Sequence, residues 1–262
     1  MAVKNFLEEI SSLASRLNGQ EETICAVAEK ASDIIKSGGW VRMFGSGHSV
    51  IPVMDTFPRY GGYVGFYPIM DPRLMWTCAS GPGGAEEVIW LERQEGYMNL
   101  FLRSVNWNAG DMLIVISHGG QNAAPVEIAQ AAKDDGLFVV ALTSMQNHKE
   151  RPATHSSGKK IGDIADIIVD NCTGPMDAVI DIDGVTGKVA GVSTLSAIIV
   201  MQSIVAETAE RLAKKGHYVK PFASPNTIGL EKGRNDQVYI DFRKAALEAN
   251  AQTLKNKNDG KS

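Results

Sequence analysis

A short apolar strand that runs directly into a turn rich in glycine and hydroxyl groups occurs twice in this chain, and it constrains the fold strongly. The first copy spans residues 40–49 and reads WVRMFGSGHS, and the second spans residues 112–122 and reads MLIVISHGGQN. In parallel α/β sheets such turns place backbone N–H groups at the carboxyl end of a strand, where a helix N-terminus binds anions. The pair predicts a phosphate-sized group held between two loops.

The strands expected along the chain are short, rich in Val and Ile, and without strict polar and apolar alternation, which is typical of strands buried on both faces. They are expected at residues 41–44, 113–116, 138–142 and 167–169. Helical patterns such as residues 125–135 separate them, so that strands and helices alternate as in βαβ units. This order predicts a three-layer α/β/α sandwich around a mainly parallel sheet.

Helices are also expected outside this core. Two amphipathic helices within residues 1–38 precede the sheet, and a helix with Ser193 as its N-cap continues to residue 215. A polar helix covers residues 236–255, and the tail at residues 256–262 is expected to be disordered. The chain, residues 1–262, is therefore interpreted as one domain whose α/β core spans residues 40–216.

Composition narrows the expected partners. The chain has 262 residues, of which 44% are hydrophobic, and this is enough to bury a large core. Its formal net charge of −4 offers no basic surface for nucleic acid or an anionic membrane, and the longest apolar helix, residues 195–206, is too short to cross a bilayer. Three widely separated cysteines and an N-terminus unlike a signal peptide indicate a cytoplasmic protein. No spacing of His, Cys, Asp and Glu in the sequence resembles a metal site, and we expect no cofactor.

The second turn and the helix after it, SHGGQNAAPVEIAQAA, resemble the sugar isomerase (SIS) domain family. Phosphosugar sites of that family use a glycine and serine turn after the first strand and a Ser-x-Ser-Gly turn after a later one. Residues 91–97, 154–172 and 191–197 are similar to a stand-alone subgroup of SIS proteins of about this length. The resemblance implies a flavodoxin-like sheet of five strands, an anionic sugar as the ligand, and assembly into a homodimer or homotetramer.

The resemblance also implies which residues hold the anion. They lie in the two turns and at the start of the helix near residue 193, and they are Ser46, Gly47, Ser49, Ser117, Gly119, Gly120, Asn122, Ser193 and Thr194. For the last two, simple capping of the helix is an equal alternative. Arg59 is a further candidate, because arginine binds an oxyanion with two hydrogen bonds. Gly119 replaces the second serine of the family turn, which removes a hydrogen bond of about 0.5–1.5 kcal/mol, so a sulfonate or carboxylate in place of phosphate is conceivable.

Conversion of an aldose to a ketose needs a base that moves a proton between C1 and C2 and an acid that opens the ring. The candidates for these roles are Glu127, which is the leading base, with Asp55, Glu92, His48 and His155. A solvated carboxylate at a helix N-terminus would equally explain Glu127, and an exposed ion pair with Arg93 would explain Glu92. A third histidine, His118, is expected to point from the second turn toward a neighbouring subunit.

These observations lead to one functional hypothesis with two alternatives. The leading hypothesis is a metal-independent aldose–ketose isomerase that acts on a phosphorylated or otherwise anionic sugar. The first alternative is a sensor that binds the sugar without catalysis. The second is a lyase, etherase or deaminase on the same site, because SIS domains serve many reactions and the fold does not determine the chemistry.

Overall fold

The computed structural model describes residues 1–76 and 80–258, with side chains described up to residue 251. Five parallel strands form the central sheet in the order β2-β1-β3-β4-β5. Their bounds are Val41–Gly45 for β1, Phe66–Ile69 for β2, Met112–Ile116 for β3, Phe138–Thr143 for β4 and Ile167–Asp170 for β5. The four strands predicted from the sequence are therefore confirmed, and the five-stranded parallel sheet is confirmed as well. β2 escaped prediction because it has four residues and contains Pro68, which suits an edge strand but not a typical strand pattern.

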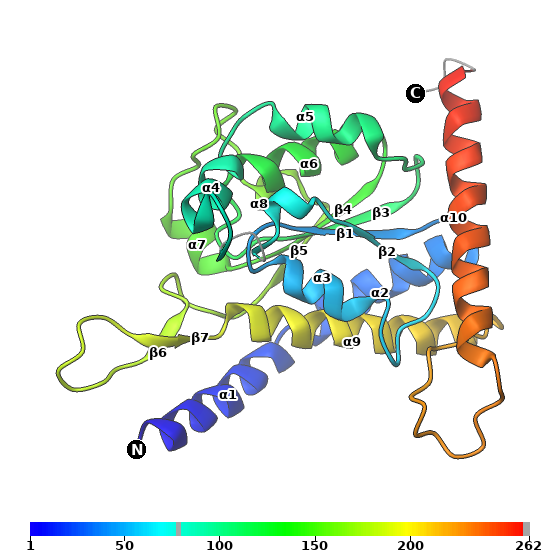
Figure 1. The fold of residues 1–262 in the computed structure, drawn as a ribbon. Helices are drawn as coiled ribbons and strands as arrows, with labels where there is room; N and C mark the ends of the chain where they lie inside the picture. Colours follow the sequence, from blue (N-terminus) through cyan, green and yellow to red (C-terminus); the bar gives the residue numbers. More distant parts are fainter. Residues whose placement is uncertain (77–79, 259–262) are drawn as a thin grey trace.

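Helices cover both faces of this sheet (Figure 1). One face carries α2 (Glu21–Lys36), α3 (Val50–Thr56) and α9 (Ser193–Lys214), and the other carries α4 (Gly84–Leu91), α5 (Tyr97–Phe101), α6 (Ala123–Asp134), α7 (Met145–Glu150) and α8 (Ile161–Ile164). Successive side chains of a strand point to opposite faces, so Val41 and Met43 of β1 join one hydrophobic cluster while Phe44 joins the other. The predicted three-layer sandwich is confirmed.

The segments outside the sandwich differ in part from expectation. The N-terminal helical pair is α1 (Ala2–Asn18) and α2, and the C-terminal helix α10 spans Arg234–Asn258, so residues 256–258 are helical and not a disordered tail. The remainder of that tail, residues 259–262, lies outside the described residues. An antiparallel hairpin of β6 (Ala178–Ile180) and β7 (Val189–Gly191) was not predicted, and in Figure 1 it projects from the body together with α1.

Contacts between aromatic rings pack α10 against the α/β sandwich. The Phe242 ring lies 5.7 Å from the Trp40 ring, 5.6 Å from the Tyr67 ring and 5.1 Å from the Phe57 ring, measured between centroids. Nearby, the guanidinium Nε of Arg42 donates to Asp111 at 3.1 Å, and both side chains are buried. A charge pair in such a place is stable only while both partners remain, because a lone buried ion is costly.

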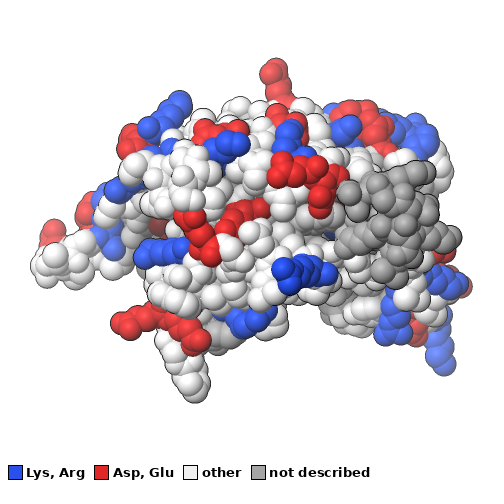
Figure 2. Space-filling view, turned by 90° about the horizontal axis from the view of Figure 1, so that it is seen from above, with Lys and Arg blue, Asp and Glu red and all other residues white. Residues whose placement is uncertain are grey.

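Charges of both signs are mixed over the surface. Figure 2 shows Lys and Arg side chains interspersed with Asp and Glu on the face seen from above. Within the described part of the chain, no helix is both long enough and apolar enough to cross a membrane.

The strand register brings the two predicted turns together. Gly45, the last residue of β1, pairs with Ile116, the last residue of β3. Because β1 and β3 are adjacent and parallel, the loops that begin at Ser46 and Ser117 leave the same edge of the sheet side by side. The candidate site is therefore located at the carboxyl ends of β1 and β3, as is general for open α/β sheets.

Candidate functional site

The first loop, residues 46–49, faces a carboxylate and an indole ring. The hydroxyl of Ser46 is buried and donates to Oε2 of Glu92 at 2.9 Å. Gly47 has a φ of +57°, and a Cβ on it would lie 3.8 Å from Glu92 Oε2 and 3.6 Å from Cε3 of Trp76. Ser49 is the N-cap of α3, although its side chain makes no capping hydrogen bond. Loop and carboxylate are thus in direct contact.

The second loop, residues 117–122, leaves backbone donors free beside a helix terminus. The N–H of Gly120 donates to the hydroxyl of Ser117 at 3.1 Å, and Gly120 adopts the left-handed conformation with φ of +66° that closes the turn. Asn122 is the N-cap of α6. Within the described ranges, no group accepts a hydrogen bond from the N–H of Gly119, Gln121 or Asn122. These donors and the N-terminus of α6 together form a site suited to an anion.

Glu92 lies between the two loops. Its Oε1 accepts from Nδ2 of Asn122 at 2.7 Å while its Oε2 accepts from Ser46, so this carboxylate joins residues 46 and 122. Burial raises the pKa of Glu92, although the hydrogen bond from Ser46 acts in the opposite direction. An exposed ion pair with Arg93 is therefore the wrong interpretation of Glu92. A partly desolvated carboxylate with a raised pKa, next to the N-terminus of a helix, has the properties of a general base.

Glu127, the leading base from the sequence, has contacts of a different kind. It is buried, and its two carboxylate oxygens accept hydrogen bonds from the N–H of Gly96 and, at 3.1 Å, from the N–H of Met98. Gly96 is the N-cap residue of α5 and Met98 lies in its first turn, so Glu127 caps that short helix. A solvated carboxylate is thus the wrong alternative, and Glu127 has the contacts of a residue that holds the backbone at Gly96 and Met98 in place.

A cavity of about 290 Å³ opens beside the second loop. Its wall includes Asn122 and the start of α6, together with Arg93, Thr154 and His155. The Nδ1 atom of His155 accepts the N–H of Ser157 at 3.1 Å, so a neutral imidazole carries its proton on Nε2, which lies 3.7 Å from Oε1 of Glu127. The lining thus combines a guanidinium, an imidazole and a helix N-terminus, which favour an anion, with the carboxylate of Glu95, which opposes one.

Sequence reasoning missed two residues of this region. Arg93 was treated only as an ion partner of Glu92, and Trp76 was not singled out because nothing in the pattern DPRLMW signals a site. The Trp76 ring lies 4.5 Å from the imidazole of His48, centroid to centroid, with 39° between their planes. His48 is exposed. The indole therefore lies beside both His48 and Gly47 of the first loop.

The side chains of Asp55 and Arg59 make their polar contacts outside the two loops. Arg59 pairs with Asp55 one helical turn away, and the Nε2 of Gln202 on α9 donates to Oδ2 of Asp55 at 2.9 Å. Among the described residues, no group of three or more His, Cys, Asp and Glu side chains is arranged to hold a metal ion.

A carboxylate already occupies the N-terminus of α9. Oδ1 of Asp177 accepts the N–H of Val192 at 2.9 Å and that of Ser193 at 2.7 Å. Burial favours the protonated form of Asp177, yet these N–H donors hold its pKa below the usual value. The N-cap is Val192, so Ser193 as N-cap was wrong, and Ser193 and Thr194 belong to the first turn. An anion at this terminus would have to displace the carboxylate or bear its repulsion.

His118 points inward. Its ring nitrogens lie 3.1 Å from the side-chain amides of Asn147 and Asn171 and 3.2 Å from the hydroxyl of Thr173. Burial lowers the pKa of His118, so the imidazole is neutral over a wider pH range than a free histidine. The expectation that His118 reaches toward a neighbouring subunit was therefore wrong.

The sheet, its two flanking helical layers and the paired loops define an α/β protein whose candidate site lies at the carboxyl edge of the sheet. Among solved structures, the chain is similar to a phosphoheptose isomerase from Francisella tularensis, with 14% identity, a TM-score of 0.49, and coverage of 79% of this chain and 96% of that chain. It is also similar to the phosphoheptose isomerase GmhA from Neisseria gonorrhoeae, with 16% identity, a TM-score of 0.49, and coverage of 79% and 97%.

Sequence comparison identifies the family. The family model of the SIS domain matches residues 5–144. The chain is 34% identical to the UPF0309 protein of Halalkalibacterium halodurans over 90% of this chain and 91% of that protein. It is also 34% identical to the UPF0309 protein of Shouchella clausii, over 87% and 91%. The chain therefore belongs to the SIS domain family and, within it, to the UPF0309 group.

Proposed function

We propose that this protein binds a phosphorylated or otherwise anionic sugar at the two loops and isomerises it between aldose and ketose. The observation that carries the proposal is the position of Glu92, a desolvated carboxylate that both loops contact through Ser46 and Asn122. An anion bound at the N-terminus of α6 would place the rest of a sugar next to this carboxylate. The arrangement supplies what the reaction needs, namely a fixed anion and a base beside it.

In the proposed reaction the anionic group binds to the N–H groups of Gly119, Gln121 and Asn122, and Arg93 adds a guanidinium at the cavity wall. Glu92 removes the proton at C2 of the open-chain aldose while the carbonyl oxygen at C1 gains a proton, which yields an enediol. Glu92 then returns the proton to C1 as the C2 hydroxyl loses its own proton, which yields the ketose. No atom is gained or lost overall.

Proton transfer to and from the sugar oxygens needs a second group. His48 is exposed at the first loop, and His155 lines the cavity with its Nε2–H available in the neutral form. Either imidazole is suited to shuttling these protons, because one ring nitrogen can donate a proton while the other accepts one. We assign the shuttle to His48, because it shares the loop with Ser46 and Gly47, which contact or face Glu92.

Isotope exchange tests the proposal. The protein is incubated in D₂O with a panel of aldose and ketose phosphates, and with sugar sulfonates and sugar acids. Removal and return of a carbon-bound proton incorporates deuterium at C1 or C2, which NMR detects, and the product keeps the mass of the substrate apart from deuterium. Release of water, lactate or ammonia would instead show a lyase, etherase or deaminase. Binding without deuterium incorporation would show a sensor, and either result would overturn the isomerase.

Assembly into a homodimer or homotetramer also remains a proposal. It is supported by α1, on which Val3 and Leu7 are 72% and 60% exposed on a helix that projects from the body. Apolar side chains on a projecting helix are typical of a surface that packs against another subunit. Light scattering that gives the 28.2 kDa mass of one chain at working concentration would contradict this.

A further inference from the structure

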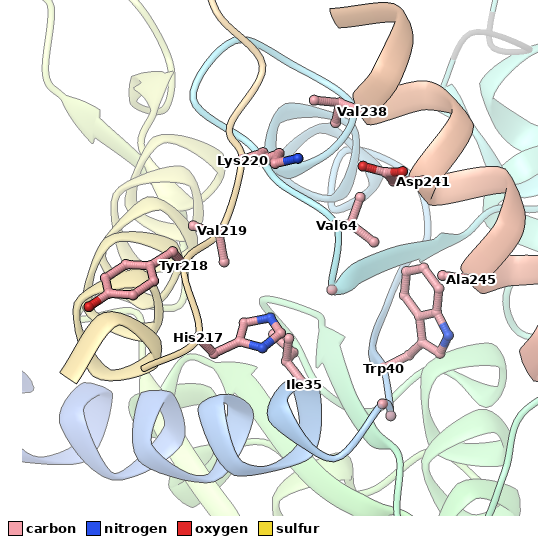
Figure 3. Close-up of a pocket in the computed structure, with 13 residues that line it drawn as sticks. Ile35, Trp40, Val64, His217, Tyr218, Val219, Lys220, Val238, Asp241 and Ala245 are labelled. Carbon is pink, nitrogen blue, oxygen red and sulfur yellow. The ribbon is translucent and has the colours of Figure 1, made fainter. Parts of the chain in front are cut away.

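A second cavity, of about 360 Å³, lies at the opposite end of the sheet from the two loops (Figure 3). It is bounded by the end of α2, the segment after α9, the residues just before β1 and β2, and α10. Trp40 lines this cavity and Ser46 belongs to the first loop, six residues later along β1. At about 3.3 Å per residue the two sites are about 20 Å apart. The second cavity is therefore separate from the proposed sugar site.

The floor of this cavity is apolar and buried. Ile35, Trp40 and Val238 line it and are 7%, 3% and 1% exposed. Gly65 permits this floor to close, because a Cβ at its position would lie 2.7 Å from Cδ1 of Ile35. An apolar group of a few carbon atoms would lose its contact with water here, which stabilises binding by about 0.8 kcal/mol for each buried CH₂.

Two opposite charges stand at the rim above this floor. Figure 3 shows the Lys220 ammonium and the Asp241 carboxylate directed toward each other across the top of the cavity. They come from different elements, since Lys220 follows α9 and Asp241 lies on α10. The side chain of Lys220 forms no hydrogen bond or ion pair with any group in the described part of the chain. Oδ1 of Asp241 accepts from Gln237 at 2.8 Å, while Oδ2 has no donor among those same residues.

We propose that this cavity binds a small zwitterion with an apolar side chain, of the α-amino-acid class. The ligand carboxylate would pair with Lys220, the ligand ammonium with Asp241, and the side chain would occupy the floor at Ile35 and Trp40. A simple anion would meet the carboxylate of Asp241, and a simple cation would meet the ammonium of Lys220. A sugar would leave the apolar floor without a partner. Opposite charges above a buried apolar floor therefore select a zwitterion.

His217 adds a second polar group near this floor. Its imidazole lies above Ile35 in Figure 3, on the side of the cavity opposite Asp241. In its neutral form an imidazole can donate to or accept from the ligand, so it can serve the carboxylate or the ammonium without adding a fixed charge. Because α10 forms one wall, a bound ligand would connect α10 to the body of the protein.

Calorimetry and thermal shift with L-leucine and L-phenylalanine test this proposal on the full chain. Two analogues of leucine serve as probes, 4-methylpentanoate without the amine and isopentylamine without the carboxylate. Each charged hydrogen bond contributes enough that loss of one partner should weaken binding about tenfold or more. We expect binding of the amino acids, with both analogues weaker by at least about that factor.

Variants assign the binding to this cavity. Asp241→Asn keeps the shape of the side chain and the acceptor for Gln237, and Lys220→Met keeps most of the length of the lysine. Each should weaken leucine binding about tenfold or more, whereas Lys244→Met, an exposed charge on the same helix outside the cavity, should not. Circular dichroism verifies that the variants are folded.

Three results would overturn the proposal. They are no heat and no rise in melting temperature with either amino acid, equal binding of leucine and its two analogues, or unchanged binding in Asp241→Asn. If a variant fails to fold, tryptophan fluorescence can locate the bound leucine. Leucine should then quench the fluorescence of the wild type and should not do so in Trp40→Phe. The proposed isomerase is tested separately, because Glu92→Gln leaves this cavity intact and should bind leucine normally.

Discussion

Replacing Glu92 with glutamine should remove the proposed base while leaving the fold intact. The side chains are nearly equal in shape, and the glutamine oxygen can still accept from Asn122 Nδ2, which now lies 2.7 Å from Glu92 Oε1. The glutamine amide can donate to the Ser46 hydroxyl, which rotates to accept it. A general base contributes about 10²- to 10⁴-fold to a rate, which corresponds to about 2.7–5.5 kcal/mol of the barrier. We therefore expect Glu92→Gln to lower kcat by this factor and to change Kd for the sugar little.

Unlike kcat, the free energy of unfolding should not fall in Glu92→Gln at alkaline pH. The folded pKa of Glu92 is raised by burial, so its contribution to stability is full below the unfolded pKa and is lost as pH rises through the folded pKa. At about pH 8 the wild type holds a desolvated charge that the amide lacks, and Glu92→Gln should be at least as stable. Near pH 4, where the wild-type carboxyl is protonated, this advantage should disappear. Urea unfolding at the two pH values measures the difference.

Glu127→Gln is the matched comparison. Each oxygen of Glu127 accepts a hydrogen bond from a backbone N–H group. In glutamine an NH₂ group replaces one of these oxygens, so that a donor faces a donor and both buried groups lose their hydrogen bond. This costs about 1–3 kcal/mol of stability. The expected pattern is an inactive but stable Glu92→Gln and a destabilised Glu127→Gln. Turnover within about tenfold of wild type in Glu92→Gln, with a larger loss in a well-folded Glu127→Gln, would refute the assignment of the base.

Three further perturbations follow from single contacts. Ser46→Ala removes the hydrogen bond that lowers the pKa of Glu92, so the acid limb of the pH profile of kcat/KM should move to higher pH, and an unmoved limb would contradict the role of Glu92. Asp177→Ala removes the cap of α9 and should cost about 0.5–2 kcal/mol in thermal unfolding at neutral pH. Because the folded pKa of Asp177 is lowered, the difference from wild type should shrink as pH falls through that pKa, and a growing difference would be inconsistent with this. Asp111→Ala leaves Arg42 as an unpaired buried cation and should cost about 3–5 kcal/mol in urea unfolding, whereas a loss below about 1 kcal/mol would show that the pair is dispensable.

The strands show which parts of the sheet can be predicted from the local sequence pattern. β1, β3, β4 and β5 were predicted within one residue at each end, because a strand buried on both faces needs a continuous apolar run that few other structures tolerate. β2 was missed because its stability comes from pairing with β1, and its own four residues with Pro68 carry little signal. The β6–β7 hairpin was missed for the same reason, since Val189–Gly191 is exposed and has no apolar pattern.

The site shows the limit of such reasoning. The sequence by itself determined that two loops rich in glycine and hydroxyl groups follow buried parallel strands, since strand burial and turn chemistry are local properties. It could not rank Glu92 above Glu127, because both are carboxylates near a loop in the chain. The choice between them depends on contacts between residues far apart in the sequence. Glu92 accepts hydrogen bonds from Ser46 and Asn122, which are 46 and 30 residues away. Glu127 instead accepts from the backbone N–H groups at the start of α5. Burial and hydrogen bonding set the chemistry of a carboxylate, and both are decided by what the fold brings against it.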